Sequence, residues 1–152
     1  MANVLVFAET RGNALRKIAH EAVTAARQLA DATGGGEVHA MVFGTSGVGS
    51  VADHLGHHGA DVVVTVENAG YANFDRESVA ATIAARAKSG SYRAVVLGFS
   101  SQGRDIGPRL AAKLDAPIVS DVTEIKASHA VFASQPEKVA DAIETAARKA
   151  AD

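Results

Sequence analysis

Four short and almost wholly apolar segments, separated by longer segments of helical pattern, limit this chain to one class of fold. Valine-rich runs closed by turn residues predict strands at residues 3–8 (NVLVFA), 38–43 (VHAMVF), 61–66 (DVVVTV) and 93–99 (RAVVLGF). Their apolar residues are nearly continuous, as in parallel strands that are covered on both faces. Strands that alternate with helices imply right-handed crossovers. The sequence therefore predicts an α/β fold with three layers around a doubly wound, mainly parallel sheet.

The segments between these strands carry helical patterns and stop at glycines. The first has apolar residues at three- and four-residue spacing from Leu15 to Leu29. A shorter helix is expected at residues 48–58. A third is expected to be capped by Asp75 and to run through Lys88, with Gly90 as its stop.

The helix after the fourth strand contains a proline. Because proline is tolerated in the first turn of a helix, Pro108 predicts a start at residues 104–107, with Asp105 as the cap.

The last part of the chain has a less regular pattern. Short strands are expected at residues 120–127 and 129–133, and the stretch SQPE at residues 134–137 has the form of a capping box that opens a last helix. At 152 residues the chain has the length of one domain, so we expect residues 1–152 to form a single domain.

Composition and charge exclude several classes of function. The chain has no cysteine, which excludes disulfides, thiolate metal sites and thiol catalysis. A formal net charge of -2 argues against nucleic-acid binding. The first residues, MANVLVFAE, lack the basic region of a signal peptide, and no apolar run is long enough to cross a membrane. These features are typical of a cytoplasmic protein.

Two polar turns are the candidate ligand site. Ligands of open parallel sheets bind beyond the carboxyl ends of the strands, where the strand order reverses, and turns at residues 9–13 and 98–105 follow the first and fourth strands. The candidate residues for a nucleotide or another anion are Glu9, Thr10, Gly98, Ser100, Ser101, Gly103, Arg104 and Asp105. Backbone N–H groups at a helix start, hydroxyls and a guanidinium all suit an anionic oxygen.

A structural role for the same turn is the alternative. The serines would then cap the turn, and Arg104 would pair with Asp105 or Asp121. No Walker motif, serine hydrolase pattern or other catalytic constellation accompanies the turn. We therefore expect no enzyme activity from this chain by itself.

Three histidines in the stretch HLGHHG are spaced like a metal-binding face. His54, His57 and His58 lie at positions i, i+3 and i+4. Gly56 and Gly59 indicate a helix that frays there, which favours a solvated helix end over a metal site.

The segment GRDIGPRLAAKLDAPIVSDVTEI, together with NVLVFAE and HGADVVVTVE, resembles the N-terminal domain of the electron transfer flavoprotein alpha subunit. The resemblance covers about residues 3–125, and residues 126–152 diverge into a strand and a terminal helix. It implies a HUP-type fold and a scaffold and partner-docking role in a flavin electron carrier. The implied partners are a beta-type subunit or a second copy of the chain, and dehydrogenases that supply the electrons.

The resemblance also bears on cofactors and on the polar turn. The positions that align with the family segment are Gly103, Arg104, Asp105, Pro108, Arg109, Ser120 and Asp121, where framework and interface roles are implied. FAD is implied for the family, but the stretches of its FAD-binding domain are absent from these residues. AMP binding at this turn stays an alternative, because the resemblance implies that the corresponding turn of the related beta subunit holds AMP.

A free-standing AMP- or ATP-binding module of the universal-stress-protein kind is the alternative function. Asp115 and Ala116 occupy the region where that pattern expects Gly-Ser or Gly-Thr, which counts against it.

Overall fold

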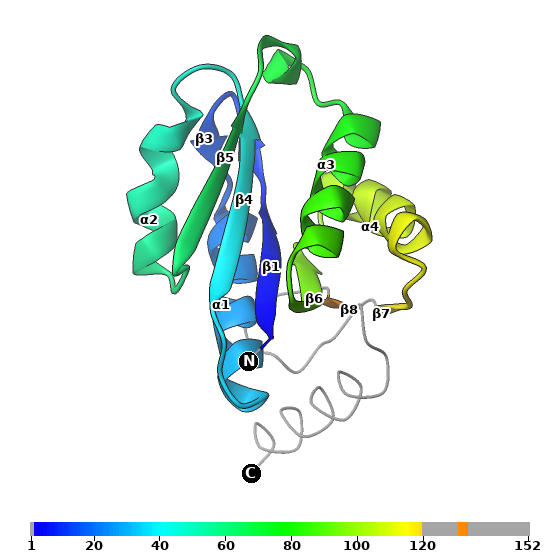
Figure 1. Cartoon of the computed structure of the whole chain (residues 1–152). Helices are drawn as coiled ribbons and strands as arrows, with labels where there is room; N and C mark the ends of the chain where they lie inside the picture. Colours follow the sequence, from blue (N-terminus) through cyan, green and yellow to red (C-terminus); the bar gives the residue numbers. More distant parts are fainter. Residues whose placement is uncertain (1, 120–130, 134–152) are drawn as a thin grey trace.

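A six-stranded sheet forms the centre of the computed structural model, which describes residues 2–119 and 131–133 (Figure 1). Its strand order is β5-β4-β1-β6-β8-β7. The parallel strands are β1 (Asn3–Ala8), β4 (Val38–Gly44), β5 (Val62–Glu67) and β6 (Tyr92–Leu97). Two short strands, β7 (Ile118–Val119) and β8 (Val131–Ala133), extend the sheet in antiparallel fashion beyond β6.

Helices cover both faces of this sheet (Figure 1). On one face lie α1 (Lys17–Ala32) and α2 (Ala52–His57), the latter preceded by a 3₁₀ turn, η1 (Val48–Val51). On the other lie α3 (Arg76–Ser89), preceded by η2 (Ala69–Ala72), and α4 (Ser101–Leu114). A two-stranded hairpin of β2 (Thr10–Arg11) and β3 (Ala14–Leu15) connects β1 to α1.

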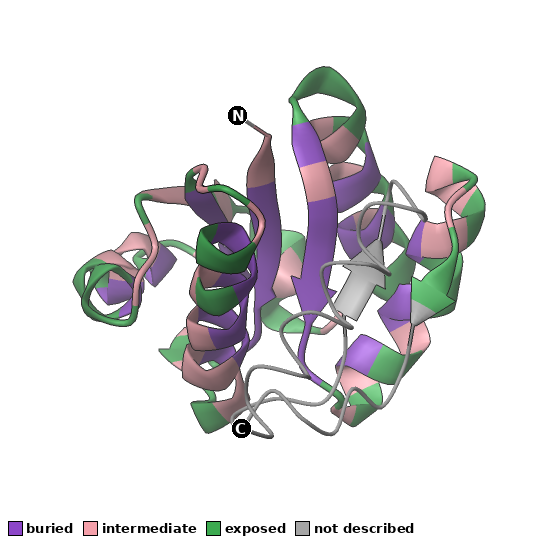
Figure 2. Cartoon of the chain, turned by 90° about the horizontal axis from the view of Figure 1, so that it is seen from below, coloured by how far each residue is buried: buried purple, intermediate pink, exposed green. Residues whose placement is uncertain are grey.

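Two hydrophobic cores lie between these layers. Along β1, Val4 and Val6 belong to the core under α1, whereas Leu5 and Phe7 belong to the core under α3 and α4. Figure 2 shows buried residues along the strands and on the sheet-facing sides of the helices. Successive strand residues point to opposite faces, so an almost continuous apolar run is needed when both faces are covered. The predicted three-layer, mainly parallel α/β fold of HUP type is confirmed.

The helices predicted from glycine stops and from the Asp75 cap are present, but α1 begins at Lys17, and Leu15, which belongs to its predicted pattern, lies in β3. The Asp75 carboxylate accepts a hydrogen bond from the Ser78 N–H at 3.2 Å, and Gly90 follows the last residue of α3. The predicted helix at residues 48–58 is divided into η1 and α2.

The predicted start of α4 is wrong. The helix begins at Ser101, Ser100 is its N-cap, and Pro108 lies inside the helix. Proline cannot donate to the carbonyl of Arg104, one turn before it. Because Arg104 and Pro108 are both exposed, water can satisfy that carbonyl, so the serine cap determines the start and the proline is tolerated.

The predictions for the end of the chain fall mostly outside the described residues. Of the expected strand at residues 129–133, Val131–Ala133 is present as β8. The expected strand at residues 120–127 and the terminal helix from residue 134 lie outside them, as do Ser120 and Asp121. No helix in the described part of the chain is both long and apolar enough to cross a membrane.

Candidate functional site at the carboxyl edge of the sheet

The two polar turns predicted as a ligand site meet at one place. Glu9 follows β1 and Gly98 follows β6, and these strands are neighbours in the sheet. From β1 the chain first continues to β4 and β5 on one side and then crosses to β6 on the other. The two turns therefore lie at the point where the strand order reverses, which is the usual ligand position in such sheets.

A buried carboxylate occupies this position. The Glu9 side chain is 2% exposed, and its Oε2 atom accepts a hydrogen bond from the Ser100 hydroxyl at 2.5 Å. The same hydroxyl accepts a hydrogen bond from the Gly103 N–H at 3.0 Å, which is the N-cap interaction of α4. Ser100 thus connects the start of α4 to the carboxylate at the end of β1.

Arg16 binds the other side of this carboxylate. Its Nη1 atom lies 2.7 Å from Glu9 Oε1, and its backbone N–H donates to the Glu9 carbonyl at 3.0 Å. Arg16 is also the residue before α1. The Glu9 carboxylate therefore lies between the N-caps of two helices, where the positive ends of the helix dipoles favour an anion. The chain supplies that anion itself.

Glycines allow the surrounding backbones to come close together. A Cβ atom at Gly103 would overlap the carbonyl oxygen of Gly98, and one at Gly98 would overlap the side chain of Ile18 on α1. The first turn of α4, the end of β6 and the start of α1 are thus in direct contact beside Glu9. Glycine at positions 98 and 103 is required by packing.

The turn after β1 is fixed by contacts to β4 and the loop that follows it. The Thr10 hydroxyl donates to the Phe43 carbonyl at 2.7 Å. Asn13 has a positive φ of 62°; its Nδ2 atom donates to Thr45 Oγ1 at 2.9 Å, and its Oδ1 atom accepts from the Thr45 N–H at 2.9 Å. The hairpin of β2 and β3 is therefore held over the end of β4.

Arg104 does not pair with Asp105, contrary to one of the two alternatives for this turn. Its guanidinium lies over the Phe99 ring, 5.3 Å from the ring centroid, and both side chains are exposed. Asp105 instead pairs with Arg76 at 2.7 Å and with Arg109 at 3.3 Å. Ser101 is exposed at the start of α4, and Asp121 lies outside the described residues.

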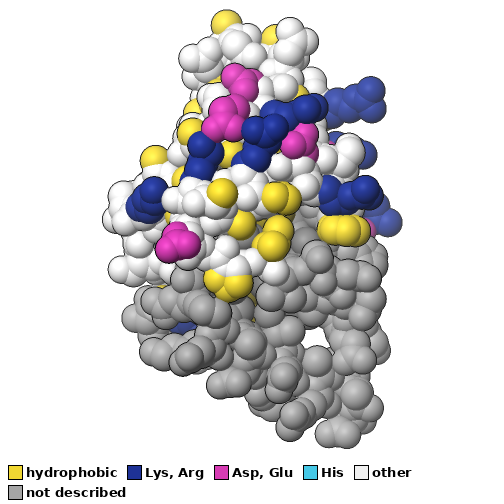
Figure 3. Space-filling view, turned by 90° about the vertical axis from the view of Figure 1, so that its right-hand side faces the viewer, with side chains coloured by type: hydrophobic (Ala, Val, Ile, Leu, Met, Phe, Trp, Pro, Cys, Tyr) yellow, Lys and Arg dark blue, Asp and Glu magenta, His cyan; other side chains and the backbone are white. Residues whose placement is uncertain are grey.

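Further ion pairs continue from Asp105 across α3 and α4. Glu77 of α3 lies 2.9 Å from Arg109 and 2.5 Å from Lys113 of α4. Hydrogen bonds from Lys113 and then Arg109 lower the pKa of the Glu77 carboxyl, and those to Asp105 and then Glu77 raise the pKa of the Arg109 guanidinium. Figure 3 shows acidic and basic side chains side by side on this face. We call this set of five residues (Arg76, Glu77, Asp105, Arg109 and Lys113) the α3–α4 ion-pair network.

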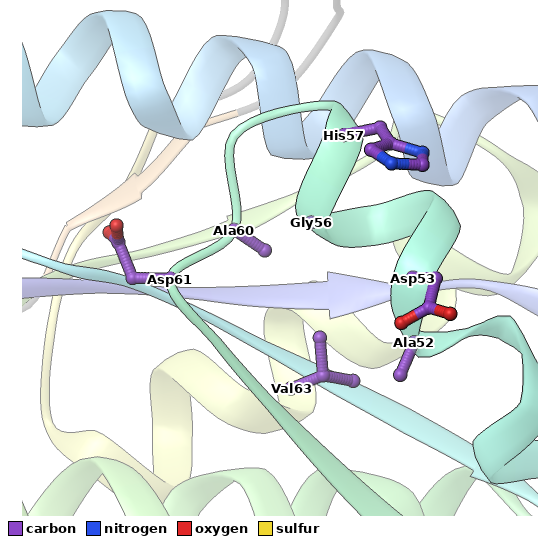
Figure 4. A pocket seen from close by; sticks show the side chains of 7 residues that line it. All are labelled: Ala52, Asp53, Gly56, His57, Ala60, Asp61 and Val63. Carbon is purple, nitrogen blue, oxygen red and sulfur yellow. The ribbon is translucent and has the colours of Figure 1, made fainter.

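A separate pocket lies between α2 and β5, away from the predicted site. It has a volume of about 520 Å³ (Figure 4) and is lined by Ala52, Asp53, Gly56, His57, Ala60, Asp61 and Val63. Asp61 is already bound by Arg27 at 2.8 Å and by the Val38 N–H at 2.8 Å. No group of three or more His, Asp or Glu side chains among the described residues is placed to hold a metal ion.

Comparison with known proteins identifies the family. The family model named electron transfer flavoprotein domain matches residues 4–151. The chain belongs to this family. It is 34% identical over 137 residues to the electron transfer flavoprotein subunit alpha of Mycobacterium leprae. The matched region covers 87% of this chain and 41% of the relative.

Other relatives have the same name. The probable mitochondrial electron transfer flavoprotein subunit alpha of Caenorhabditis elegans is 36% identical over 124 residues, covering 81% of this chain and 36% of the relative. The alpha subunit of Bacillus subtilis is 30% identical over 122 residues. This match covers 80% of this chain and 36% of the relative. The chain spans about two fifths of the length of these curated relatives. The resemblance to the N-terminal domain of the electron transfer flavoprotein alpha subunit is confirmed, and none of these matches favours the stress-protein alternative.

The carboxyl edge does not fit the phosphates of FAD or AMP in the arrangement described. A phosphate beside Ser100 would face the Glu9 carboxylate, which carries the same sign of charge, and the backbones at Gly98 and Gly103 leave no gap between them. This electrostatic argument favours the framework interpretation of the turn. The nucleotide-binding turn stays a prediction, which ligand titration can test.

Sequence patterns brought Glu9 and Ser100 onto the same edge but missed the residues that hold them. Arg16 comes seven residues after Glu9, and this spacing does not by itself predict a contact. The two side chains meet because the hairpin of β2 and β3 folds the chain back. Asn13 could have been found from its position after Gly12, because asparagine and glycine are typical of turns with positive φ.

Proposed function

We propose that this chain is the alpha-type scaffold and partner-docking domain of an electron transfer flavoprotein, with the flavin held elsewhere in the assembly. The observation that carries the proposal is the family match over residues 4–151, together with similarity to the alpha subunits of Bacillus subtilis, Mycobacterium leprae and Caenorhabditis elegans. The proposed partner is a beta-type subunit, dehydrogenases supply the electrons, and the assembly acts in the cytoplasm. FAD is the proposed cofactor of the whole assembly.

The closed carboxyl edge supports a scaffold role for the turn at residues 98–105. Its Ser100 hydroxyl and the Gly103 N–H are used in contacts within the chain. The Glu9 carboxylate lies at the helix start where open parallel sheets in general bind the anionic group of a ligand. Two of the polar groups that a phosphate would need, the Ser100 hydroxyl and the Gly103 N–H, are therefore engaged. We propose framework roles for Glu9, Ser100 and Gly103.

Exposed apolar side chains support the docking role. Phe99 is 39% exposed, Ile118 is 46% exposed, and they are the exposed large hydrophobic residues of the described part of the chain. Arg104, stacked on Phe99, has no ion pair within that part. Aromatic and arginine side chains are the types that most often dominate binding energy at protein interfaces. Hydrophobic side chains are also exposed on the face shown in Figure 3.

Thermal unfolding with ligands and partner tests the proposal. We expect the purified chain to be colourless and its unfolding temperature to be unchanged by AMP, ATP or FAD. A ligand at 100 times its dissociation constant would stabilise the chain by about 2.7 kcal/mol, which this measurement detects. Co-expression with a beta-type subunit should give a complex in size-exclusion chromatography.

The variants Phe99→Ala and Arg104→Ala separate the two functions. Both should weaken that complex, whereas Arg11→Ala, at an exposed arginine of β2, should leave it unchanged. Stabilisation by AMP or ATP that Arg104→Ala abolishes would show instead that the turn binds a nucleotide.

A further inference from the structure

Two imidazoles are in contact between α1 and the end of α2, and a third lines a pocket beside them. His20 lies on α1 and His58 directly follows α2, and their ring centroids are 4.2 Å apart with an interplanar angle of 41°. His54 lies one turn before His58. It lines, together with His20, Asn13 and Val51, a pocket of about 390 Å³. Two histidines of the stretch HLGHHG, His54 and His58, therefore lie near His20 of α1. Spacing along the sequence does not reveal this neighbour, because it comes from another helix.

The packing of His20 favours the neutral imidazole. Its Nδ1 atom is buried and has no hydrogen-bond partner in the described part of the chain. A protonated ring carries N–H groups on both nitrogens, and the one at Nδ1 would have no acceptor. In the neutral ring the proton can stay on Nε2, so burial of Nδ1 costs less.

The charges around the cluster do not compensate an added proton. The other charged or titratable residues of α1, α2 and the segment after α2 are Lys17, Glu21, Arg27, Asp31, Asp53, His57 and Asp61. Glu21 is paired with Lys17, and Arg27 is paired with Asp31 and Asp61. Asp53 and His57 line the pocket between α2 and β5 (Figure 4). The remaining residues around His20 and His54 in their pocket, from Asn13 to Leu15 and Val51, are uncharged.

The electrostatics agree with this geometry. Burial, followed by the neighbouring His58 and His54, lowers the pKa of the His20 imidazole from its ordinary value of 6.5. A histidine with a lowered pKa binds fewer protons when α2 is closed than when it is open. The arrangement with α2 packed on α1 is therefore fully favoured when the pH is above the ordinary histidine pKa of 6.5. It loses stability as the pH falls below that pKa.

We propose that His20, His54 and His58 form an acid-sensitive latch, which holds α2 on α1 at neutral pH and releases α2 in mildly acidic solution. Helix α2 is the element best suited to open by itself. It has six residues, its Gly56 is exposed, and Leu55 is its buried side chain. A helix this short has no stability apart from its packing.

Hydrogen exchange of the full chain tests the latch. Amide protection of α2 is measured from about pH 7.5 to about pH 5.5 and corrected for the intrinsic exchange rate. We expect the protection of α2 to fall while that of β1 and β4 is kept. Each unit of pKa difference between the closed and open forms corresponds to about a tenfold change in protection.

Three substitutions decide whether the cluster causes the change. His20→Phe keeps a ring in the contact but removes the group whose pKa is lowered, and His58→Phe removes a neighbouring imidazole that lowers the pKa of His20, so either should reduce the pH dependence. His57→Gln changes an exposed histidine of the same helix that faces the other pocket and should leave it intact. Constant protection of α2 in the unmodified chain, or an equal loss of pH dependence in His57→Gln, would overturn the proposal. Because His58 is exposed, its variant remains informative if His20→Phe does not fold.

Discussion

At the scale of single residues, the two adjacent serines at the start of α4 have different roles. The Ser100 hydroxyl donates to the buried Glu9 carboxylate and accepts from the Gly103 N–H, whereas Ser101 is exposed. A hydroxyl that joins a helix cap to a buried charge contributes more than a cap alone, because its loss also leaves the carboxylate short of a donor.

We therefore expect Ser100→Ala to lower the free energy of unfolding by about 2 kcal/mol. The matched variant Ser101→Ala should change it by less than about 0.5 kcal/mol. Urea unfolding followed by circular dichroism measures both. Equal effects of the two substitutions would show that the contact between Ser100 and Glu9 has no energetic importance.

The same residue explains why part of the site could not be predicted. Proline rules placed the start of α4 near residue 104 because they use only local sequence. The Ser100 cap is strengthened by Glu9, 91 residues earlier in the chain, and this contact exists only after β1 and β6 pair. The pairing of Glu9 with Arg16 and the contact of His20 with His58 likewise depend on how elements pack.

At the scale of elements, two helical glycines have opposite environments. In α4, a Cβ at Gly103 would overlap the Gly98 carbonyl oxygen, whereas in α2 a Cβ at Gly56 would have nothing within 4 Å. Alanine is the better helix former at both positions. Whether a Gly→Ala substitution stabilises or destabilises the chain is therefore determined by packing.

Gly103→Ala should therefore destabilise the chain by about 3 kcal/mol through forced backbone movement. Gly56→Ala should stabilise it by about 0.5 to 1 kcal/mol through helix propensity. The midpoints of urea unfolding compare the two variants with the unmodified chain. Destabilisation by Gly56→Ala would show that the surface of α2 beside β5 is more crowded than described.

The α3–α4 ion-pair network gives the packing of these helices a pH dependence. The pKa of Glu77 is lowered in the folded chain, so the unfolded chain binds more protons at Glu77 between the lowered value and the ordinary value of 4.5. The contribution of Glu77 to the free energy of unfolding is therefore present when the pH is above the ordinary pKa. It is lost as the pH falls through the lowered pKa of the folded chain.

We expect the unmodified chain to lose stability on acidification below the ordinary pKa of Glu77 more steeply than Glu77→Gln, and the two to differ less at high salt. Thermal unfolding across a series of acidic buffers measures this. Parallel curves for the two proteins would show that these exposed pairs are too well solvated to matter.

Elements that are buried on both faces were the easiest to predict. All seven residues of β4 are buried, and this uniform environment requires the apolar run seen in the sequence. The hairpin of β2 and β3 has two residues in each strand, too few to give a pattern, and it was expected as a plain turn. Its geometry depends on contacts of Thr10 and Asn13 with β4 and the following loop.

At the scale of the whole molecule, one arginine joins three parts of the chain at the end of the sheet opposite Glu9. Arg93 of β6 donates to the carbonyls of Ala2 at 3.0 Å, Thr33 at 2.5 Å and Gly35 at 3.1 Å. These acceptors are 91, 60 and 58 residues away in the sequence. Two of them follow the end of α1, where a positive charge is favoured by the helix dipole.

A single ammonium group cannot replace this arrangement, because the guanidinium directs its donors along several fixed directions. We expect Arg93→Lys to lower the free energy of unfolding by about 2 kcal/mol through the loss of two of three hydrogen bonds. Arg11→Lys, at an exposed position of β2, should change it by less than about 0.5 kcal/mol. Urea unfolding measures both variants. If they are equally stable, the ends of β1, α1 and β6 are held together by core packing without the help of Arg93.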